Sequence, residues 1–179
     1  GASLNTVCAQ IGLSKGLIYH YFKDKDALYL ACIAVCFHAM TDYIRDAAYM
    51  CTGTAAERLN KYFDARLRFF AEHPHFLGLF SDALLNPPAH LIADIKREKA
   101  DFDAMNIAVL TAILSAEPLR EGISISAVAE DFRMYVDFFN TQFRAALRGG
   151  QPAELVLREH EKTCRRQLDI LLHGVLRNL

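Results

Sequence analysis

The sequence predicts an all-α protein, and three observations support this fold class. Apolar residues recur every three to four positions through the long segments, which is the period of an amphipathic helix. No segment shows the sustained alternation of apolar and polar residues that is typical of a half-buried strand. Proline and glycine fall between the periodic segments, at Gly12, Gly53, Pro74, Pro87, Pro88, Pro118, Gly122, Gly149, Gly150 and Pro152. These breaks divide the chain into about eight helices.

We expect the first two helices to be short and the pattern to lengthen from Asp24 onward. In chain order, the expected helices span residues 4–11, 15–22, 25–50, 55–72, 75–85, 89–115, 126–148 and 153–177. Gly53 and Pro74 separate helices of the first half, because neither residue type suits a helix interior. The run from Gly149 to Pro152 separates the last two helices in the same way.

The segment from Ser3 to Lys25 has the layout of a helix-turn-helix followed by a longer helix. Small or apolar side chains lie on one side of its first helix, at Val7, Cys8 and Ile11. Gly12 permits a tight turn, and Leu13 fills the corner between the helices. Ser14 is a natural N-cap for the second helix, because its hydroxyl can accept an otherwise unpaired backbone N–H.

The second short helix has an inward and an outward side. The inward side carries Leu17, Ile18 and Phe22, and the outward side carries Lys15, Gly16, Tyr19, His20 and Tyr21. The outward side chains are rich in hydrogen-bond donors suited to phosphate oxygens and base edges, and Gly16 permits close approach. Lys25 opens the next helix, where its ammonium can join backbone N–H groups in holding a phosphate. This pattern is typical of a recognition helix.

Charge supports this interpretation only weakly. The whole chain carries a net charge of −1, so any nucleic-acid contact must come from a local patch. Residues 1–30 carry Lys15, Lys23 and Lys25 against Asp24 and Asp26, a net charge of +1. The alternative is that the aromatic residues at positions 19, 21 and 22 form the core of a small helical subdomain and that residues 23–26 form a solvated loop.

The run GLSKGLIYHYFKDKDALYLA, residues 12–31, closely resembles the signature of the tetracycline-repressor (TetR) family. In that signature a short turn, a Ser-capped recognition helix ending in Tyr-x-x-Phe, and a Lys that opens the next helix occur together. The resemblance implies DNA-contacting roles for Ser14, Lys15, Gly16, Leu17, Tyr19, His20, Tyr21 and Lys25. It implies that Tyr19 and Lys25 contact phosphates, and that Lys15, Gly16 and His20 lie nearer the base edges.

The resemblance also implies the domain organisation. Residues 1–48 are expected to form the helix-turn-helix DNA-binding domain with its connecting helix, and residues 49–179 a larger helical effector-binding and dimerisation domain. The family has a further helix before the first helix seen here, and we expect it to lie outside a sequence that begins at Gly1.

The last two long helices have more apolar surface than one partner can cover. Helix 126–148 carries one stripe at Val128, Phe132, either Tyr135 or Val136, Phe139, Phe143 and Leu147. Met134 and Phe138 stand on a second stripe, and the final helix has its own apolar face at Leu157, Cys164, Leu168, Leu171, Leu172 and Val175. A homodimer in which these helices form a four-helix bundle would bury this surface, as the family resemblance implies. The alternative is an ordinary core within one chain.

The middle helices carry residues that can line a ligand cavity. They are Phe69, Phe76, Phe80, Leu84, Phe102, Met105, Phe132, Tyr135 and Phe139. Their chemistry favours a small hydrophobic or aromatic effector. Plain core packing is the alternative for each of them.

Enzymatic and metal-binding motifs are incomplete, and we expect no enzyme activity, no cofactor and no metal. Glu72 and His75 have the spacing of a di-metal motif, but the motif needs a second copy, and Pro74 interrupts the helix. Cys32 and Cys36 share a helix face without a second pair to complete a zinc site. Five cysteines without a regular framework indicate reduced thiols, and the longest apolar run, residues 104–114, is too short to span a membrane. We therefore expect a cytoplasmic protein without a membrane partner.

Together these patterns predict a ligand-responsive, DNA-binding transcriptional regulator. The expected partners are a double-stranded, palindromic DNA operator, a small effector and a second copy of the chain. Repression relieved by the effector is the expected mode, with activation as its variant. The alternative function is a helical protein-interaction module that does not bind DNA.

Overall fold

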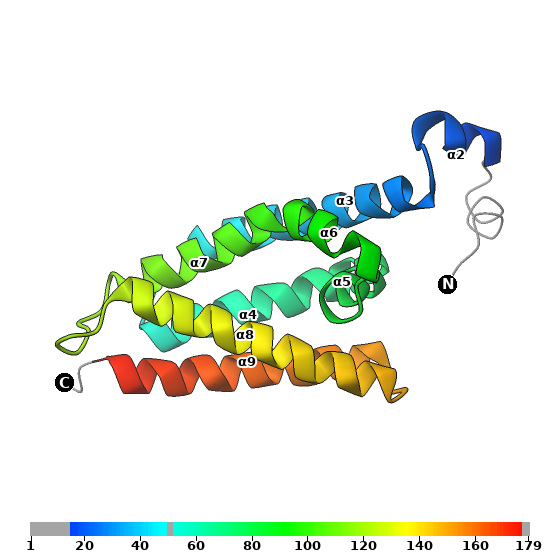
Figure 1. Ribbon diagram of the computed structural model, residues 1–179. Coiled ribbons are helices and arrows are strands. Elements are labelled where there is room, and N and C mark those ends of the chain that lie inside the picture. Colours follow the sequence, from blue (N-terminus) through cyan, green and yellow to red (C-terminus); the bar gives the residue numbers. More distant parts are fainter. Residues whose placement is uncertain (1–14, 50–51, 177–179) are drawn as a thin grey trace.

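The computed structural model describes residues 15–49 and 52–176, and in these residues the chain is helical without strands (Figure 1). An isolated antiparallel bridge joins Leu119 to Leu176. The all-α prediction is confirmed. The expected helix 4–11 lies outside the described residues.

Most of the expected helices are present, with ends within two residues of the expected ones. The helices are α2 (Lys15–Tyr21), α3 (Lys25–Tyr49), α4 (Ala55–Glu72), α5 (His75–Leu85), α6 (Ile92–Glu98), α7 (Ala100–Leu114), α8 (Ile125–Arg148) and α9 (Ala153–Val175), with a short 3₁₀ turn η1 (Ala89–Leu91). Helices α4 and α5 begin and end at the predicted residues. Both are bounded by residues with a clear physical effect, Gly53 and Thr54 before α4 and Pro74 before α5.

The prediction of one helix over residues 89–115 is wrong. The chain forms η1, then α6, and then turns at Lys99 before α7 begins. The turn lets each helix direct a buried side chain into the core, Ile95 from α6 and Phe102 from α7, while both helices pack on α3. No proline or glycine lies near Lys99, so the sequence carries no local signal for this break.

Helix α3 lies alongside α6 and α7, α4 and α5 occupy the middle, and α8 and α9 form an antiparallel pair on the far side (Figure 1). The turn between α8 and α9 contains Gly150, which has a φ of 86°, a conformation that favours glycine. Helix α2 extends beyond the N-terminal end of α3, away from the bundle (Figure 1). This arrangement places α2 where a partner outside the bundle can reach it.

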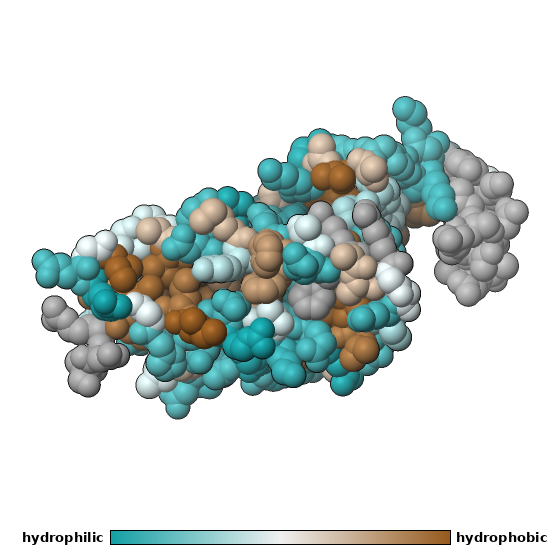
Figure 2. Space-filling view, turned by 60° about the horizontal axis from the view of Figure 1, so that its bottom comes forward, coloured by the Kyte–Doolittle hydropathy of each residue, from teal (hydrophilic) through white to brown (hydrophobic). Residues whose placement is uncertain are grey.

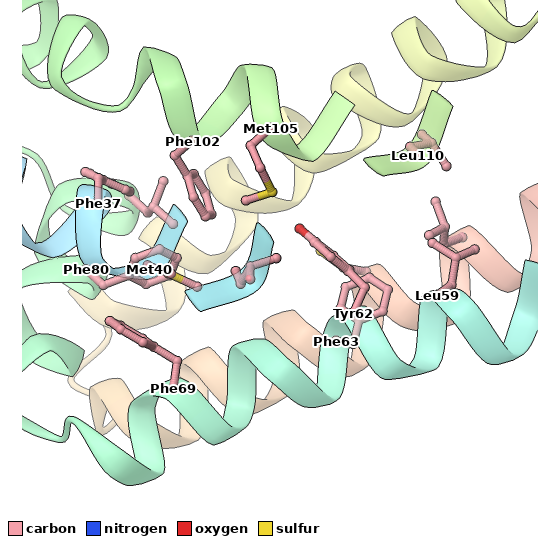
Figure 3. Packing of buried hydrophobic residues seen from close by; sticks show 14 of the residues in the cluster. Phe37, Met40, Leu59, Tyr62, Phe63, Phe69, Phe80, Phe102, Met105 and Leu110 are labelled. Atoms are coloured by element: carbon pink, nitrogen blue, oxygen red, sulfur yellow. The ribbon is translucent and has the colours of Figure 1, made fainter. Parts of the chain in front are cut away.

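The core is built mainly from α3, α4, α5 and α7, and α6, α8 and α9 also contribute buried residues (Figure 3). Phe37 of α3, Phe80 of α5 and Phe102 of α7 contact one another, with ring centroids 5.4 to 6.0 Å apart. The other buried apolar residues of α3 recur at helical spacing, at Ile33, Cys36, Met40 and Ile44. The core therefore holds α3 along much of its length.

Helix α3 contains a longer apolar stretch than residues 104–114, which the sequence analysis took as the longest apolar run. The stretch Lys25–Ala47 is long and apolar enough to cross a membrane by length and composition alone, which the sequence reasoning missed. The core helix of a globular protein passes the same test, and α3 packs against α4, α5, α6 and α7. We attribute its apolar character to this packing.

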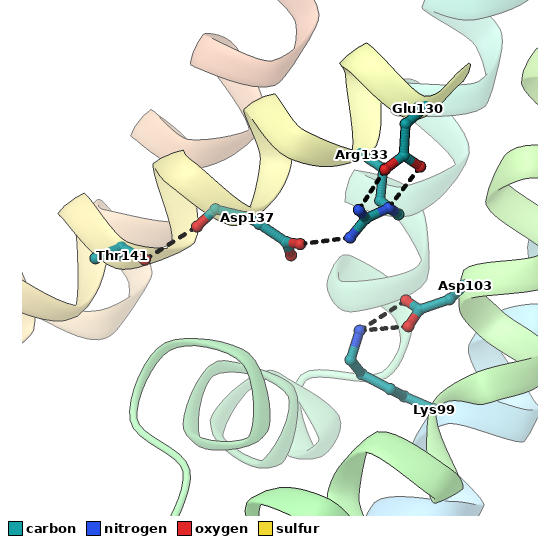
Figure 4. A network of polar contacts seen from close by, with 6 residues as sticks. All are labelled: Lys99, Asp103, Glu130, Arg133, Asp137 and Thr141. Carbon is teal, nitrogen blue, oxygen red and sulfur yellow. Dashed lines mark hydrogen bonds and ion pairs between the residues drawn. The ribbon is translucent and has the colours of Figure 1, made fainter. Parts of the chain in front are cut away.

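A polar stripe on α8 lies across from the start of α7 (Figure 4). Arg133 pairs with Glu130 at 2.6 Å and with Asp137 at 3.0 Å, and the hydroxyl of Thr141 donates to the Asp137 carbonyl. The Lys99 ammonium binds Asp103 on α7. In each of these ion pairs the two charged side chains lie three or four residues apart in the sequence, so each charge finds its partner nearby on the same face of its helix.

Helix α4 begins with a reciprocal cap. The Glu57 amide donates to the Thr54 hydroxyl at 3.3 Å, and the Thr54 amide donates to the Glu57 carboxylate at 2.9 Å. The Thr54 amide and hydroxyl together lower the pKa of Glu57. This is the capping box of a stable helix start.

Replacing Thr54 by alanine should lower the free energy of unfolding by about 1 kcal/mol, because the Glu57 amide loses its acceptor. Thr54→Ser keeps the hydroxyl and should remain within a few tenths of a kcal/mol of the wild type. Urea unfolding followed by circular dichroism measures both variants. Equal losses in the two variants would contradict a role for the hydroxyl.

Candidate nucleic-acid interface

The candidate interface consists of α2 and the first turn of α3. Ile18 of α2 is buried, and its carbonyl accepts the Phe22 amide at 2.9 Å, which closes the helix. Phe22 itself is half-buried. Inward positions for Ile18 and Phe22 are what the sequence pattern predicts.

The opposite side of this short helix faces solvent. Gly16, His20, Tyr21, Lys23 and Lys25 are exposed, and Tyr21 is 73% exposed. The His20 and Tyr21 rings meet edge to face, with centroids 5.2 Å apart. Exposed donors on one side of a helix at the end of the molecule provide the geometry that a groove-reading helix needs.

Several predicted contact residues cannot be placed in full. Ser14 lies outside the described residues, and for Lys15, Leu17 and Tyr19 the structure describes the backbone of α2 but not the side chain. Their DNA-contacting roles stay predictions, as do those of Gly16, His20, Tyr21 and Lys25.

Asp24 holds the junction between α2 and α3, a role that the sequence reasoning missed. Its carboxylate accepts the Ala27 amide at 2.8 Å, and its carbonyl accepts the Leu28 amide at 3.3 Å. Asp24 is therefore the N-cap of α3, and Lys25 is the first residue of the helix. An aspartate directly before the first periodic residue is a recognised N-cap signal. A phosphate at this helix start cannot use the Ala27 amide, which Asp24 already occupies.

A second contact ties the start of α3 to the larger part of the chain. The Asp26 carboxylate and His90 Nε2, from η1, are 2.9 Å apart. The two residues are separated by 64 positions, so no local pattern could have predicted the contact. The contact links the segment that carries α2 to the turn before α6.

The predicted effector-pocket residues fall into different environments. Phe69, Phe80, Leu84, Phe102 and Met105 are buried, while Phe76, Phe132 and Phe139 are partly buried. Phe69 stacks on Phe76 with centroids 5.7 Å apart. Tyr135 stands apart from the rest, because it is 46% exposed. A cavity lined by this set stays a prediction.

Two grooves are found elsewhere on the surface. One, of about 370 Å³, lies between α4 and α9 and has Leu59, Phe63 and Leu168 in its lining. The other, of about 470 Å³, lies between α7 and α8 and includes Ile107 and Arg133. Neither contains a predicted effector-pocket residue.

In the part of the chain that the structure describes, no group of three or more His, Cys, Asp or Glu side chains is placed to hold a metal ion. Glu72, half of the incomplete di-metal motif, accepts the Tyr43 hydroxyl at 2.9 Å. Cys32, Cys36 and Cys164 are free thiols, and burial raises the pKa of Cys36 and Cys164 to about 12.

Comparison with known proteins bears directly on α2. Residues 1–32 match the family model described as bacterial regulatory proteins, tetR family. This segment includes α2, the Asp24 cap and the start of α3. The resemblance to the TetR family is confirmed. No curated protein matches the sequence.

Solved structures with the same fold include TetR-family regulators. One from Chloroflexus aurantiacus is 20% identical, with a TM-score of 0.56, and the match covers 98% of this chain and 84% of that one. One from Legionella pneumophila is 18% identical, with a TM-score of 0.56 over 93% of this chain and 86% of that one. The ketosteroid regulator KstR2 of Mycobacterium tuberculosis is 17% identical, with a TM-score of 0.51 over 99% and 86%. At these identities the likeness establishes the TetR fold.

Removing the Asp24 carboxylate should loosen the start of α3. In Asp24→Ala, the Ala27 amide loses its acceptor, so its hydrogen exchange should accelerate and the free energy of unfolding should fall by about 1 kcal/mol. Asp24→Asn can still accept the amide and should keep the wild-type exchange rate. Exchange measured by NMR at Ala27 tests the cap, and equal protection in the alanine variant would rule it out.

Proposed function

We propose that this chain is a ligand-responsive transcriptional regulator that binds a palindromic DNA operator as a homodimer. The match of residues 1–32 to the regulatory family, together with the exposed position of α2, is the observation that carries the proposal. The family resemblance supports DNA binding itself. Repression, release by a small hydrophobic or aromatic effector, a cytoplasmic location and the absence of a catalytic role are parts of the proposal.

In the proposed complex α2 enters the major groove. Lys15, Gly16 and His20 lie near base edges, and Tyr19 and Lys25 contact phosphates on either side. Ser14, Leu17 and Tyr21 complete the contact surface. The exposure of Gly16, His20 and Lys25 supports this orientation, and the buried Ile18 marks the side that faces away from DNA.

The proposed dimer forms through α8 and α9. Met134 and Phe138 of α8 are 51% and 56% exposed, and Leu155 and Ile170 of α9 are 51% and 57% exposed. The view that brings the α8 and α9 side of the molecule forward shows apolar residues among the polar ones on this surface (Figure 2). Arg133 forms its ion pairs with Glu130 and Asp137 on a neighbouring stripe of α8, so these charged side chains do not cover Met134 and Phe138. Large exposed apolar side chains on adjacent helices are typical of an interface.

The two domains act together through α3. A two-fold dimer places its recognition helices about 34 Å apart, one turn of DNA. An effector bound between the helices of residues 49–179 would change that separation by moving α3. The effector changes the separation only if it binds the DNA-competent and the DNA-incompetent arrangements of the dimer with different affinities.

DNA binding is tested with the full-length natural protein and DNA from its own upstream region across a salt series. Tyr19→Ala and Lys25→Ala should both weaken binding. Lys25→Ala removes one cation from each subunit of the dimer and should also reduce the slope of log affinity against log salt by about 2. Lys162→Ala removes an exposed lysine of α9 and should leave the slope unchanged. Weak binding that ignores sequence and both α2 substitutions would favour the interaction-module alternative.

The dimer is tested by charge on the apolar face. A Met134→Lys, Phe138→Lys variant should shift the protein from dimer to monomer in analytical ultracentrifugation, because two ammonium groups cannot be buried without partners. Leu67→Lys, on the exposed side of α4, is the matched control and should remain dimeric. A wild-type monomer, or a dimer that survives the double substitution, would contradict this interface.

A further inference from the structure

A buried ion pair joins α4 to α9 in the middle of the bundle. Arg66 Nη2 lies 2.6 Å from Glu161 Oε1, and the two side chains are only 11% and 5% exposed. Arg66 Nη1 also donates to the Tyr62 hydroxyl at 3.1 Å. Sequence reasoning missed this pair, which lies in a mostly apolar core.

The pair does not satisfy its own hydrogen-bonding groups. Arg66 Nε is buried without an acceptor, and neither oxygen of Glu161 receives a hydrogen bond at favourable geometry, despite the short distance to Arg66. Leaving buried charged groups partly unpaired is strongly destabilising. Proteins seldom retain such groups unless a further partner meets them. The free Nε therefore indicates an acceptor that comes from outside the chain.

Aromatic rings surround the guanidinium. Its central carbon lies 5.8, 6.0 and 5.7 Å from the ring centroids of Tyr62, Phe80 and Phe102. The Tyr62 hydroxyl donates to Asn106 of α7 at 2.5 Å. Tyr62 of α4 points toward Met105 of α7, beside Phe102 (Figure 3). A cation enclosed by apolar surface can recognise a molecule that is charged at one end and apolar at the other.

We infer that Arg66 is the anchor for the carboxylate of an effector whose aromatic or apolar body lies against Phe80, Phe102 and Met105. This inference rests on the proposed function, because it names the chemical class of the effector of that regulator. The three apolar residues belong to the set that the sequence predicted for the pocket, and Arg66 adds the group that sets the ligand's orientation. A planar guanidinium suits a carboxylate, because it can donate two parallel hydrogen bonds.

The charges at the site permit the exchange of one carboxylate for another. Burial lowers the pKa of Arg66, but Glu161 and Tyr62 raise it by more, so the guanidinium stays charged. Burial raises the pKa of Glu161, against the opposing effect of Arg66. Glu161 can therefore take up a proton when a ligand carboxylate binds Arg66, and the site keeps its charge balance.

The rings cover Arg66 in this structure, so a ligand reaches it only by displacing side chains. Met105 is the neighbour that yields most easily, because its unbranched thioether has three rotatable bonds. It lies on α7, one helix turn after Phe102. Movement there would act on α3, against which α7 packs.

Isothermal titration of the full chain with matched probes tests the inference. Naphthoate is compared with naphthamide, and octanoate with octanamide, so that each pair differs only in the charged group. At least one carboxylate should bind the wild type about 10-fold more tightly than its amide, since charge-assisted hydrogen bonds are roughly twice as strong as neutral ones. No binding of either carboxylate, or equal binding of acid and amide, would overturn the inference.

Two variants locate the effect. Arg66→Met should abolish the preference for the carboxylate, while Arg68→Met, the same change on the exposed side of α4, should keep it. Glu161→Gln removes the competing carboxylate and should strengthen carboxylate binding by about 10-fold, leaving the amides unchanged. If circular dichroism shows that Arg66→Met does not fold, Glu161→Gln decides alone. A preference that survives Arg66→Met, or weaker carboxylate binding in Glu161→Gln, contradicts the anchor and leaves a purely structural ion pair.

Operator binding is measured separately on the wild type. A protein that binds its operator but shows no carboxylate preference keeps the proposed function and loses this inference. A protein that prefers carboxylates through Arg66 but binds no DNA loses the proposed function.

Discussion

The packing of α3 in the core is the constraint on which the rest of the structure depends. One end of this 25-residue helix continues from the Asp24 cap and α2, and buried residues from Ile33 to Ile44 hold it between α4, α5, α6 and α7. Because a helix is stiff over this length, the same contacts that stabilise the core also orient α2. The Asp26 to His90 contact adds a second attachment close to the end that carries α2. No separate hinge is needed to explain how α2 is positioned.

The interior is less uniformly apolar than the composition suggests. Besides Arg66 and Glu161, His160 of α9 is buried and lies 2.6 Å from the Asn140 side-chain oxygen of α8. Burial lowers the pKa of His160 to about 4, so the imidazole is neutral near pH 7 and its Nε2 donates to Asn140. These polar contacts connect α9 to α4 on one side and to α8 on the other. The Arg66 to Glu161 contact and the His160 to Asn140 contact each join one residue of α9 to one residue of a neighbouring helix. A shift of α9 along its axis would therefore break both contacts.

Local chemistry explains which parts of the fold could be predicted. The bounds of α4 and α5 follow from Gly53 and Pro74, whose effects act within one or two residues. The outward side of α2 follows from helical spacing and from the family signature. The turn at Lys99 escaped prediction because the packing of α6 and α7 on α3 imposes it, against a continuous apolar period.

The polar residues that the sequence reasoning missed were missed for a different reason, because their partners lie on other helices. Helical spacing places Arg66 on the apolar stripe of α4, between Tyr62 and Phe69, and Glu161 on the apolar face of α9, between Leu157 and Cys164. A charge on each apolar face was a signal that the sequence reasoning did not use, and only the contact between α4 and α9 shows that the two are partners. Arg165 is similar, because it binds Asn60 and Asp64 of α4 and lies over the Phe63 ring. The sequence reasoning therefore proposed Phe80 and Phe102 for a pocket and missed the buried guanidinium that lies beside their rings. The aromatic residues it proposed remain untested as a cavity.

The length of α3 has a mechanical consequence. At 1.5 Å per residue, its 25 residues span about 37 Å. The buried residues begin at Ile33, so only about 12 Å of the helix extends beyond them toward α2. A tilt of about 5° at Ile33 would carry the Lys25 end through only about 1 Å. A larger displacement of α2 therefore requires the core residues between Ile33 and Ile44 to repack.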